Sequence, residues 1–312
     1  MKTLAQFESL EAVHLPARPL HLAIGMFDGV HLGHRAVIVP AVEAARREGG
    51  TAAVLTFWPH PSALFRPNDA TPLIQDGPAK AHVLQALGVE AMITQPFTRE
   101  FASVEAAEFL PWLKRRLPAL AAVYVGENFK FGRGRKGDVA GLIAAAPAAG
   151  ISVFSAPHVT VDGEPVSSTR VRGLLAAGEI EAANALLGYA YFAEGVVTAG
   201  KRLGRTIGFP TLNLAWSPGL RPKLGVYAVR VAGENTAALP AVANYGLRPT
   251  VEQASEPRLE IHVLGACPLG EGDRITAEWL KFLRPEKKFP GVDELRAQIA
   301  ADRAAAEKFF GA

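Results

Sequence analysis

The sequence predicts an α/β protein made of two halves, because two different patterns follow one another along the chain. Up to about residue 187, short apolar runs alternate with longer segments of helical periodicity, which is typical of a parallel sheet covered by helices. Beyond that point, apolar runs follow one another with turns between them, as in an antiparallel barrel or sandwich. The sequence shows no low-complexity linker between the halves, so we expect two closely joined domains, 1–187 and 188–312.

In the first half, buried strands are expected where an apolar run is closed by Gly, Pro or a polar turn. Ligands of a parallel sheet bind at the carboxyl ends of its strands, so the residues that follow these runs are the candidates for a site. The expected strands are 22–27, 52–57, 91–97, 122–126 and 151–156, and the expected helices are 33–49, 78–88, 103–117 and 138–150.

In the second half, short apolar runs follow one another with turns and without intervening helices. A last amphipathic segment, 292–310, is expected to be a helix with Asp293 as its N-cap, and with Leu295, Ile299 and Phe309/Phe310 near one face. The expected strands are 191–199, 209–214, 225–232, 239–246, 258–265 and 274–283.

Composition limits the class of protein. A net charge of +3 over 312 residues permits anionic ligands but is slight for a nucleic-acid binder. The single cysteine, Cys267, excludes an internal disulfide and a Cys-cluster zinc site, and we expect it to be a small packing residue. The uncharged stretch 139–157 is mostly Ala and contains Pro147, so it is too weakly apolar and too broken to span a membrane. We expect a cytoplasmic protein with neither nucleic acid nor membrane as partner, and the sequence is compatible with a homo-oligomer.

The stretch "GMFDGVHLGHR" (25–35) places His31 and His34 three apart, where the first strand gives way to a helix. At that spacing the imidazoles lie on one face of the helix start, whose free N–H groups favour a phosphate. There they can stabilise the charge that develops on a transferring phosphoryl group. Surface or capping histidines can show the same spacing. A zinc site is disfavoured because no third ligand lies at a suggestive distance.

The same stretch resembles the His-x-Gly-His signature of nucleotidylyltransferases and, more closely, the prokaryotic bifunctional riboflavin kinase/FMN adenylyltransferase family, also called FAD synthetase. Three further segments match that family in order: "TFWPHP", "VGENFKFGRGRKGD" and "VSSTRVR". Trp58 is a departure, because an acidic residue is common there, whereas His60 and the prolines are kept. The resemblance implies a Rossmann-like domain with His31 and His34 as catalytic residues. It implies that ATP and the flavin are bound by Gly25, Phe27, Asp28, Gly29, Asn128, Arg133, Ser168, Thr169 and Arg172.

Several of these positions also have a chemical reading of their own. Asn128 ends a strand at the ligand edge, where its amide can orient a ring or a phosphate. Arg133, Arg135 and Lys136 sit among glycines in what reads as a flexible cationic loop, although a solvated basic loop looks the same. Ser168 and the hydroxyl after it precede a helix, where hydroxyls cap the helix and also bind phosphate.

The second informative stretch is "AGKRLGRTIGFPTLNL" (199–214), whose glycines and basic residues could cradle phosphates. It lacks the order of a Walker A loop. Thr211 and Asn213 point to one side of the following strand, and two neutral oxygens suit a Mg²⁺ ion shared with ATP phosphates. Two ordinary outward residues of a strand would show the same pattern.

This region resembles the riboflavin kinase module, whose "PTAN" signature appears here as "PTLN", followed by "GVYAVRV", "ANYGLRPTV" and "RLEIHVL". The last segment supplies Glu260, aligned with the catalytic glutamate of the family, which can accept the proton of the riboflavin 5′-hydroxyl. "GACPLGEGDR" departs from the family, and we expect a local loop change there. The resemblance implies a β-barrel in which Thr211 and Asn213 hold Mg²⁺. It assigns nucleotide or flavin binding to Gly200, Lys201, Gly204, Arg205, Gly208 and Pro210.

Together the motifs predict a two-step enzyme. ATP phosphorylates riboflavin to FMN with release of ADP, and a second ATP adenylylates FMN to FAD with release of pyrophosphate. An adenylyltransferase acting on pantetheine phosphate or on a nicotinamide nucleotide would lack the kinase half. A flavin- or RNA-binding regulator without activity would lack His31, His34 or Glu260, and all three are present.

Overall fold

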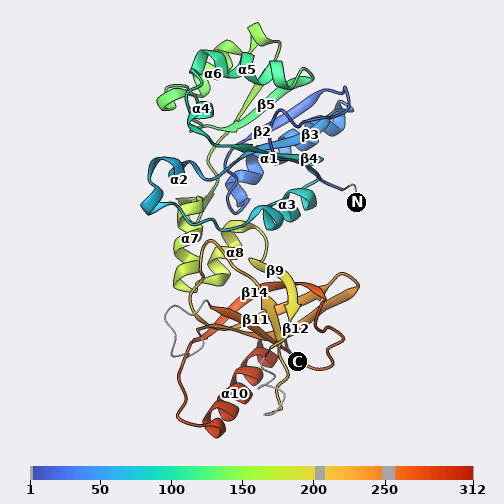
Figure 1. Cartoon of the computed structure of the whole chain (residues 1–312), viewed down its shortest axis with the longest axis vertical. Helices are drawn as coiled ribbons and strands as arrows, with labels where there is room; N and C mark the ends of the chain where they lie inside the picture. Colours follow the sequence, from blue (N-terminus) through green and yellow to red (C-terminus); the bar gives the residue numbers. More distant parts are fainter. Residues whose placement is uncertain (1–2, 201–207, 248–256, 312) are drawn as a thin grey trace. The chain divides into compact units, whose positions relative to one another are not determined.

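The computed structural model describes residues 3–200, 208–247 and 257–311 (Figure 1). The chain forms two compact units that divide between Ser168 and Thr169. The first is a parallel α/β unit and the second contains an antiparallel barrel followed by a terminal helix, so the expected fold class is confirmed.

The first unit is built on a six-stranded sheet in which all neighbouring strands are parallel, in the order β1-β4-β3-β2-β5-β6. The five strands expected from the apolar runs are present. The edge strand β1 was not expected, because three residues are too few to show a pattern. The strands are β1 (Ala5–Phe7), β2 (Leu20–Ile24), β3 (Thr51–Trp58), β4 (Ala91–Pro96), β5 (Leu120–Gly126) and β6 (Ser152–Ala156).

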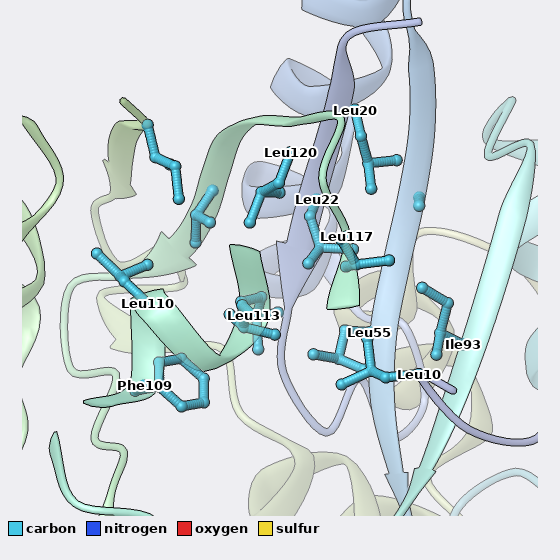
Figure 2. Packing of buried hydrophobic residues seen from close by; sticks show 14 of the residues in the cluster. Leu10, Leu20, Leu22, Leu55, Ile93, Phe109, Leu110, Leu113, Leu117 and Leu120 are labelled. Atoms are coloured by element: carbon cyan, nitrogen blue, oxygen red, sulfur yellow. The ribbon is translucent and has the colours of Figure 1, made fainter. Parts of the chain in front are cut away.

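Side chains alternate between the two faces of this sheet, and helices cover both. Leu22 of β2 and Leu55 of β3 pack with Leu113 of α5 on one face, as Figure 2 shows. The other face packs against α1, which contacts β2, β3 and β5. The helices are α1 (Leu32–Arg47), α2 (Pro61–Phe65), α3 (Gly77–Ala86), α4 (Arg99–Ala102), α5 (Phe109–Arg116) and α6 (Val139–Ala145).

Two of the expected helices are shorter than their patterns. Segment 103–117 is helical as α5 only from Phe109, after a 3₁₀ turn at Ala106–Glu108. Segment 138–150 ends as an α-helix at Ala145, and the 3₁₀ turn Pro147–Ala149 follows, because proline cannot continue the backbone hydrogen bonding of a helix. A small hairpin, β7 (Thr160–Val161) and β8 (Glu164–Pro165), completes the unit.

In the second unit, six antiparallel strands close into a barrel in the order β10-β13-β12-β11-β14-β9. Trp279 fills its interior together with Tyr227 and Tyr245, and its ring meets that of Tyr227 at a tilt and that of Tyr245 edge-on. The six expected strands are therefore confirmed. They are β9 (Phe192–Thr198), β10 (Leu212–Ala215), β11 (Gly225–Gly233), β12 (Thr236–Gly246), β13 (Arg258–Val263) and β14 (Arg274–Pro285).

Three helices accompany the barrel: α7 (Ser168–Ala177), α8 (Ile180–Leu187) and α10 (Val292–Phe310). Asn184 of α8 donates to the Trp279 carbonyl oxygen at 2.8 Å, which fastens α8 to β14. The N-cap of α10 is Gly291, so Asp293 as N-cap was wrong: its carboxylate lies in the first turn, where the helix dipole favours it. Within the ranges described, no helix combines the length and the apolar character needed to cross a membrane.

One buried ion pair fastens α10 to the barrel. Arg284 of β14 donates from Nε and Nη2 to the two carboxylate oxygens of Asp302, each at 2.7 Å, and Asp302 is almost fully buried. Gln298 Nε2 donates to the same carboxylate at 2.9 Å. Removing one partner of such a pair leaves an uncompensated buried charge.

We therefore expect Asp302→Ala to lower the free energy of unfolding of the second unit by about 3–5 kcal/mol. Glu307→Ala is the matched control, because Glu307 forms a solvent-exposed pair with Arg303 on the same helix and such pairs contribute less than about 1 kcal/mol. Denaturant unfolding followed by Trp fluorescence measures both. Equal losses for the two variants would contradict the role given to Asp302.

Candidate active sites

A left-handed turn follows β2 at the ligand edge of the sheet. Phe27, Gly29 and Val30 have φ values of 45°, 82° and 37°. For Phe27 and Val30 this conformation costs of order 1–3 kcal/mol each and persists only where the surroundings fix it. Both of these side chains are buried in the core, which holds the turn in place.

Asp28 ties the turn to a second segment of the chain. Its carboxylate is 1% exposed and accepts hydrogen bonds from the backbone N–H of Ile74 at 2.9 Å and of Gln75 at 3.3 Å. Its backbone carbonyl accepts from the Ser168 hydroxyl at 2.9 Å. The expected ligand residue Asp28 is therefore a buried scaffold carboxylate that organises the turn, and its side chain is used inside the protein.

The two histidines begin α1. His31 is the N-cap of α1, and its Nδ1 accepts the backbone N–H of His34 at 3.3 Å. An Nδ1 that accepts must be unprotonated, so the neutral ring carries its proton on Nε2, where it can donate to a ligand. The rings of His31 and His34 stack with centroids 3.6 Å apart, and Phe27 meets the His34 ring edge-on at 5.3 Å. The structure thus brings these three predicted residues together.

Gly33 lies directly beside this stack. A Cβ atom at position 33 would lie 3.2 Å from Cε1 and 3.3 Å from Nδ1 of the His31 ring. The glycine therefore leaves room for the His31 ring beside the helix start. The N–H groups of the first turn remain near the histidines, in the arrangement that binds anions at helix N-termini.

The strand order places this turn at a topological switch point. The chain passes from β2 to β3 and β4 on one side, and then returns to β5 on the other side of β2. Ligands of open α/β sheets bind in the crevice between such strands. Asn128 follows the end of β5, next to β2, and therefore lies at the same sheet edge as the histidine turn.

Asn128 is held by a partner that the sequence did not suggest. Its Nδ2 lies 2.5 Å from His158 Nε2, and the His158 backbone N–H donates to Glu127 at 3.0 Å. His158 follows β6, so the segments that follow β5 and β6 are linked at this edge. No residue spacing in the sequence reveals the pair, because the partners are 30 positions apart.

The basic loop after Asn128 has defined contacts within itself and with the segment around Glu105. Phe131 and Gly137 exchange two backbone hydrogen bonds at 3.1 and 2.9 Å, and Arg133 pairs with Glu105 at 3.1 Å. Gly132 allows a close approach to Ala106: a Cβ there would lie 2.7 Å from the Ala106 Cα. These contacts close the loop on itself and place Arg133 beside Glu105.

The hydroxyl segment after β8 also reaches the histidine turn. The Ser168 hydroxyl reaches the turn through its hydrogen bond to Asp28. Ser168 is the first residue of α7, whereas the sequence predicts a position just before that helix. Thr169 and Arg172 lie further along α7 and belong to the second compact unit. Gly25 directly follows β2, and its N–H donates to the Leu55 carbonyl at 3.1 Å.

In the second unit, three polar residues form a row across neighbouring strands. Asn213 of β10 pairs in register with Glu260 of β13, which pairs with Asn244 of β12. Leu259 and Ile261, on either side of Glu260, are buried in the barrel, so the row faces outward. The expected metal ligand Asn213 and the expected base Glu260 are therefore neighbours on one face.

A cavity of about 480 Å³ lies beside this row, and its lining includes Gly200, Gly208, Pro210, Thr211 and Asn213. The Asn213 Oδ1 is buried and has no hydrogen-bond partner among the residues described. Gly200 packs against that amide so closely that a Cβ would lie 2.2 Å from its nitrogen. Five expected residues thus meet here, Glu260 lies next to them in register, and Lys201, Gly204 and Arg205 lie outside the described residues.

Two further residues line the cavity. His262 Nδ1 lies 2.8 Å from the Pro210 carbonyl oxygen, which orients the loop before β10. Cys267 is exposed, so the expectation of a packed cysteine was wrong. Within the described part of the chain, no cluster of three or more His, Cys, Asp or Glu could hold a metal.

Comparisons with known proteins cover both units. Residues 15–170 match the FAD synthetase family, and residues 187–310 match the riboflavin kinase family. The bifunctional riboflavin kinase/FMN adenylyltransferase of Escherichia coli K12 is 38% identical over 290 residues, which covers 93% of this chain and 92% of that protein. Its counterpart from Listeria monocytogenes is 38% identical over 298 residues, with the same coverage of 93% and 92%.

A solved structure shares the fold. The crystal structure described as a macrolide-efflux protein from Streptococcus pneumoniae superposes with a TM-score of 0.85 at 27% identity and covers 98% of this chain and 99% of its own.

Proposed function

The chain belongs to the bifunctional riboflavin kinase/FMN adenylyltransferase family, and on that premise we propose which of its residues carry each reaction. The enzyme phosphorylates riboflavin with ATP to give FMN and ADP. It then transfers AMP from a second ATP to FMN, which gives FAD and pyrophosphate. We propose that residues 1–187 carry the adenylyl transfer and residues 188–312 the kinase reaction. The matched families cover both halves, which disfavours an adenylyltransferase for another substrate.

The stacked histidine pair at the start of α1 is the observation that carries the first assignment. An oxygen of the FMN phosphate attacks the α-phosphorus of ATP, and the bond to pyrophosphate breaks. The nucleophile is already an anion, so no protein base is required, and the site supplies position and charge stabilisation. His31, with its proton on Nε2, donates to the phosphate oxygens together with His34 and the first N–H groups of α1. Asn128 and Ser168 border the same edge and are proposed as ligand-binding residues, with Thr169, Arg172 and Arg133.

The row formed by Asn213, Glu260 and Asn244 is the observation that supports the assignment of the kinase site. The riboflavin 5′-hydroxyl attacks the γ-phosphorus of ATP, its proton passes to the Glu260 carboxylate, and ADP leaves. Glu260 stands on the outer face between Asn213 and Asn244, whose amides can orient the carboxylate or the substrates. The glycines at 200 and 208 allow phosphates to approach the backbone beside the cavity.

The residues around the cavity fit a Mg²⁺ ion. The buried Asn213 Oδ1 has no hydrogen-bond partner among the described residues and can serve as an oxygen ligand. Thr211 supplies a second neutral oxygen on the same side of the chain. Bound there with ATP, Mg²⁺ would neutralise charge on the phosphates. We propose Thr211 and Asn213 as its protein ligands.

We also propose that the enzyme acts in the cytoplasm, where ATP is available to both reactions, and that any assembly is a homo-oligomer. Cell fractionation and light scattering test these two proposals.

For the adenylyl site, we expect His31→Ala and His34→Ala each to lower the rate of FAD formation from FMN by about 10²–10³, since loss of one donor of this kind costs that much. FMN formation by the same protein should stay within twofold of wild type. Flavins resolved by chromatography measure both reactions in one sample. FAD formation within a fewfold of wild type would remove the histidines from the mechanism.

For the kinase site, we expect Thr211→Ala and Asn213→Ala to raise the Mg²⁺ concentration that gives half-maximal FMN formation by about tenfold or more. Ser217→Ala, an exposed hydroxyl after β10, is the control and should leave that concentration unchanged. A Mg²⁺ titration of riboflavin phosphorylation measures the shift. A normal Mg²⁺ dependence in both variants would contradict the assignment.

A further inference from the structure

Lys80 of α3 is a buried charged group that neither reaction yet explains. Its side chain is 6% exposed, and within the described ranges no other lysine is buried to this extent. Lysine is almost never fully buried unless its amine has partners. The partners of the Lys80 amine therefore indicate its role.

The amine of Lys80 is directed at the base of the histidine turn. Nζ donates to the Met26 carbonyl oxygen at 2.9 Å and to the Thr56 hydroxyl oxygen at 3.2 Å. The Thr56 hydroxyl in turn donates to the same Met26 carbonyl at 2.9 Å. Two donors therefore converge on one carbonyl, at the residue just before the left-handed turn.

Without the two hydrogen bonds to the Met26 carbonyl, the left-handed turn could relax at this residue. The next residue, Phe27, has a φ of 45° and carries the ring that meets His34. Beyond it, Asp28 holds Ile74 and Gln75, which lie only a few residues before Lys80 on the chain. The segment 74–80 thus holds the turn at two points: Lys80 donates to the Met26 carbonyl, and the backbone N–H groups of Ile74 and Gln75 donate to the Asp28 carboxylate.

We propose that Lys80 is a positioning residue for adenylyl transfer, which holds the Met26 carbonyl so that the strained turn presents His31 and His34 to the nucleotide. This inference rests on the proposed role of the two histidines. It assigns Lys80 no contact with substrate, so its loss should act on kcat far more than on KM.

The charge of the amine gives the role a pH dependence. Burial lowers the pKa of Lys80 to about 8, against the opposing effect of the Asp28 carboxylate, which is the ionisable group known to act on it in the described structure. Below pH 8 the amine is charged and its hydrogen bonds are charge-assisted; above pH 8 they weaken. FAD formation should therefore decline as pH rises through 8.

Stability should move in the opposite direction, which separates positioning from a structural role. Between pH 8 and the ordinary lysine pKa of 10.5, the unfolded chain binds more protons at Lys80 than the folded chain. Unfolding then becomes less favourable as pH rises through that window. A loss of adenylyl transfer without a loss of stability is the signature of positioning.

The experiment compares full-length Lys80→Met with His82→Met, an exposed residue of the same helix, from pH 7 to 9.5. We expect Lys80→Met to lower kcat for FAD formation by about 10- to 100-fold, since small displacements of catalytic groups have effects of that size, with KM for FMN and ATP within threefold. The decline of FAD formation as pH rises through 8 should be absent from Lys80→Met, whereas His82→Met should show it as the wild type does. FMN formation by the same samples reports pH effects on ATP common to both reactions.

Thr56→Val keeps the test decisive if Lys80→Met does not fold, because it removes only one hydroxyl from the same network and should lower kcat at least threefold. In the His34→Ala background, Lys80→Met should lose most of its effect, because residues that act through one group are not additive. A wild-type profile that is flat to pH 9.5, a normal kcat in a folded variant, or full additivity with His34→Ala would overturn the inference. Normal FAD formation by His34→Ala alone would instead overturn the proposed role of the histidines.

Discussion

The left-handed turn between β2 and α1 is the constraint on which the chemistry of the first unit depends. A strand that ended in relaxed backbone would not deliver a helix N-terminus and two stacked imidazoles to the sheet edge. The turn is maintained because Phe27 and Val30 are buried, because Asp28 accepts two backbone N–H groups, and because Ser168 donates to its carbonyl. Each of these contacts comes from a different part of the chain, so the site exists only when the whole unit is folded.

In the second unit, the arrangement of the polar row depends on the strand register of the barrel. In a closed barrel the register is fixed all the way round, and it places Asn213 and Glu260 opposite one another on the outer face. The chemistry of the two reactions explains why the proposed sites use different residue types. A hydroxyl nucleophile must lose a proton, so the kinase site needs a carboxylate, whereas the FMN phosphate is already an anion and the adenylyl site needs donors.

Much of the fold could be predicted from the sequence, because it rests on local pattern, whereas the proposed site residues rest on the resemblance to a known family. Strand alternation places Glu260 outward, and the glycines before His31 mark the strand-to-helix turn. What could not be predicted depends on contacts between distant segments. Lys80 sits on a helix where a lysine ordinarily faces solvent, the pairing of Asn128 with His158 spans 30 positions, and Arg133 contacts Glu105, 28 positions away. Asp293 has the right residue type for an N-cap, but the helix begins at Val292 and its N-cap is Gly291, two residues before Asp293.

The central claim is that one chain holds two complete and chemically distinct sites. The most direct test mixes two full-length variants, His31→Ala and Glu260→Gln, with riboflavin, ATP and Mg²⁺. We predict that His31→Ala alone stops at FMN, that Glu260→Gln alone leaves riboflavin unphosphorylated, and that the mixture makes FAD at a rate that rises with the amount of the Glu260→Gln protein. A mixture that accumulates FMN without FAD, although Glu260→Gln adenylylates supplied FMN, would contradict a partition in which each site works without the other.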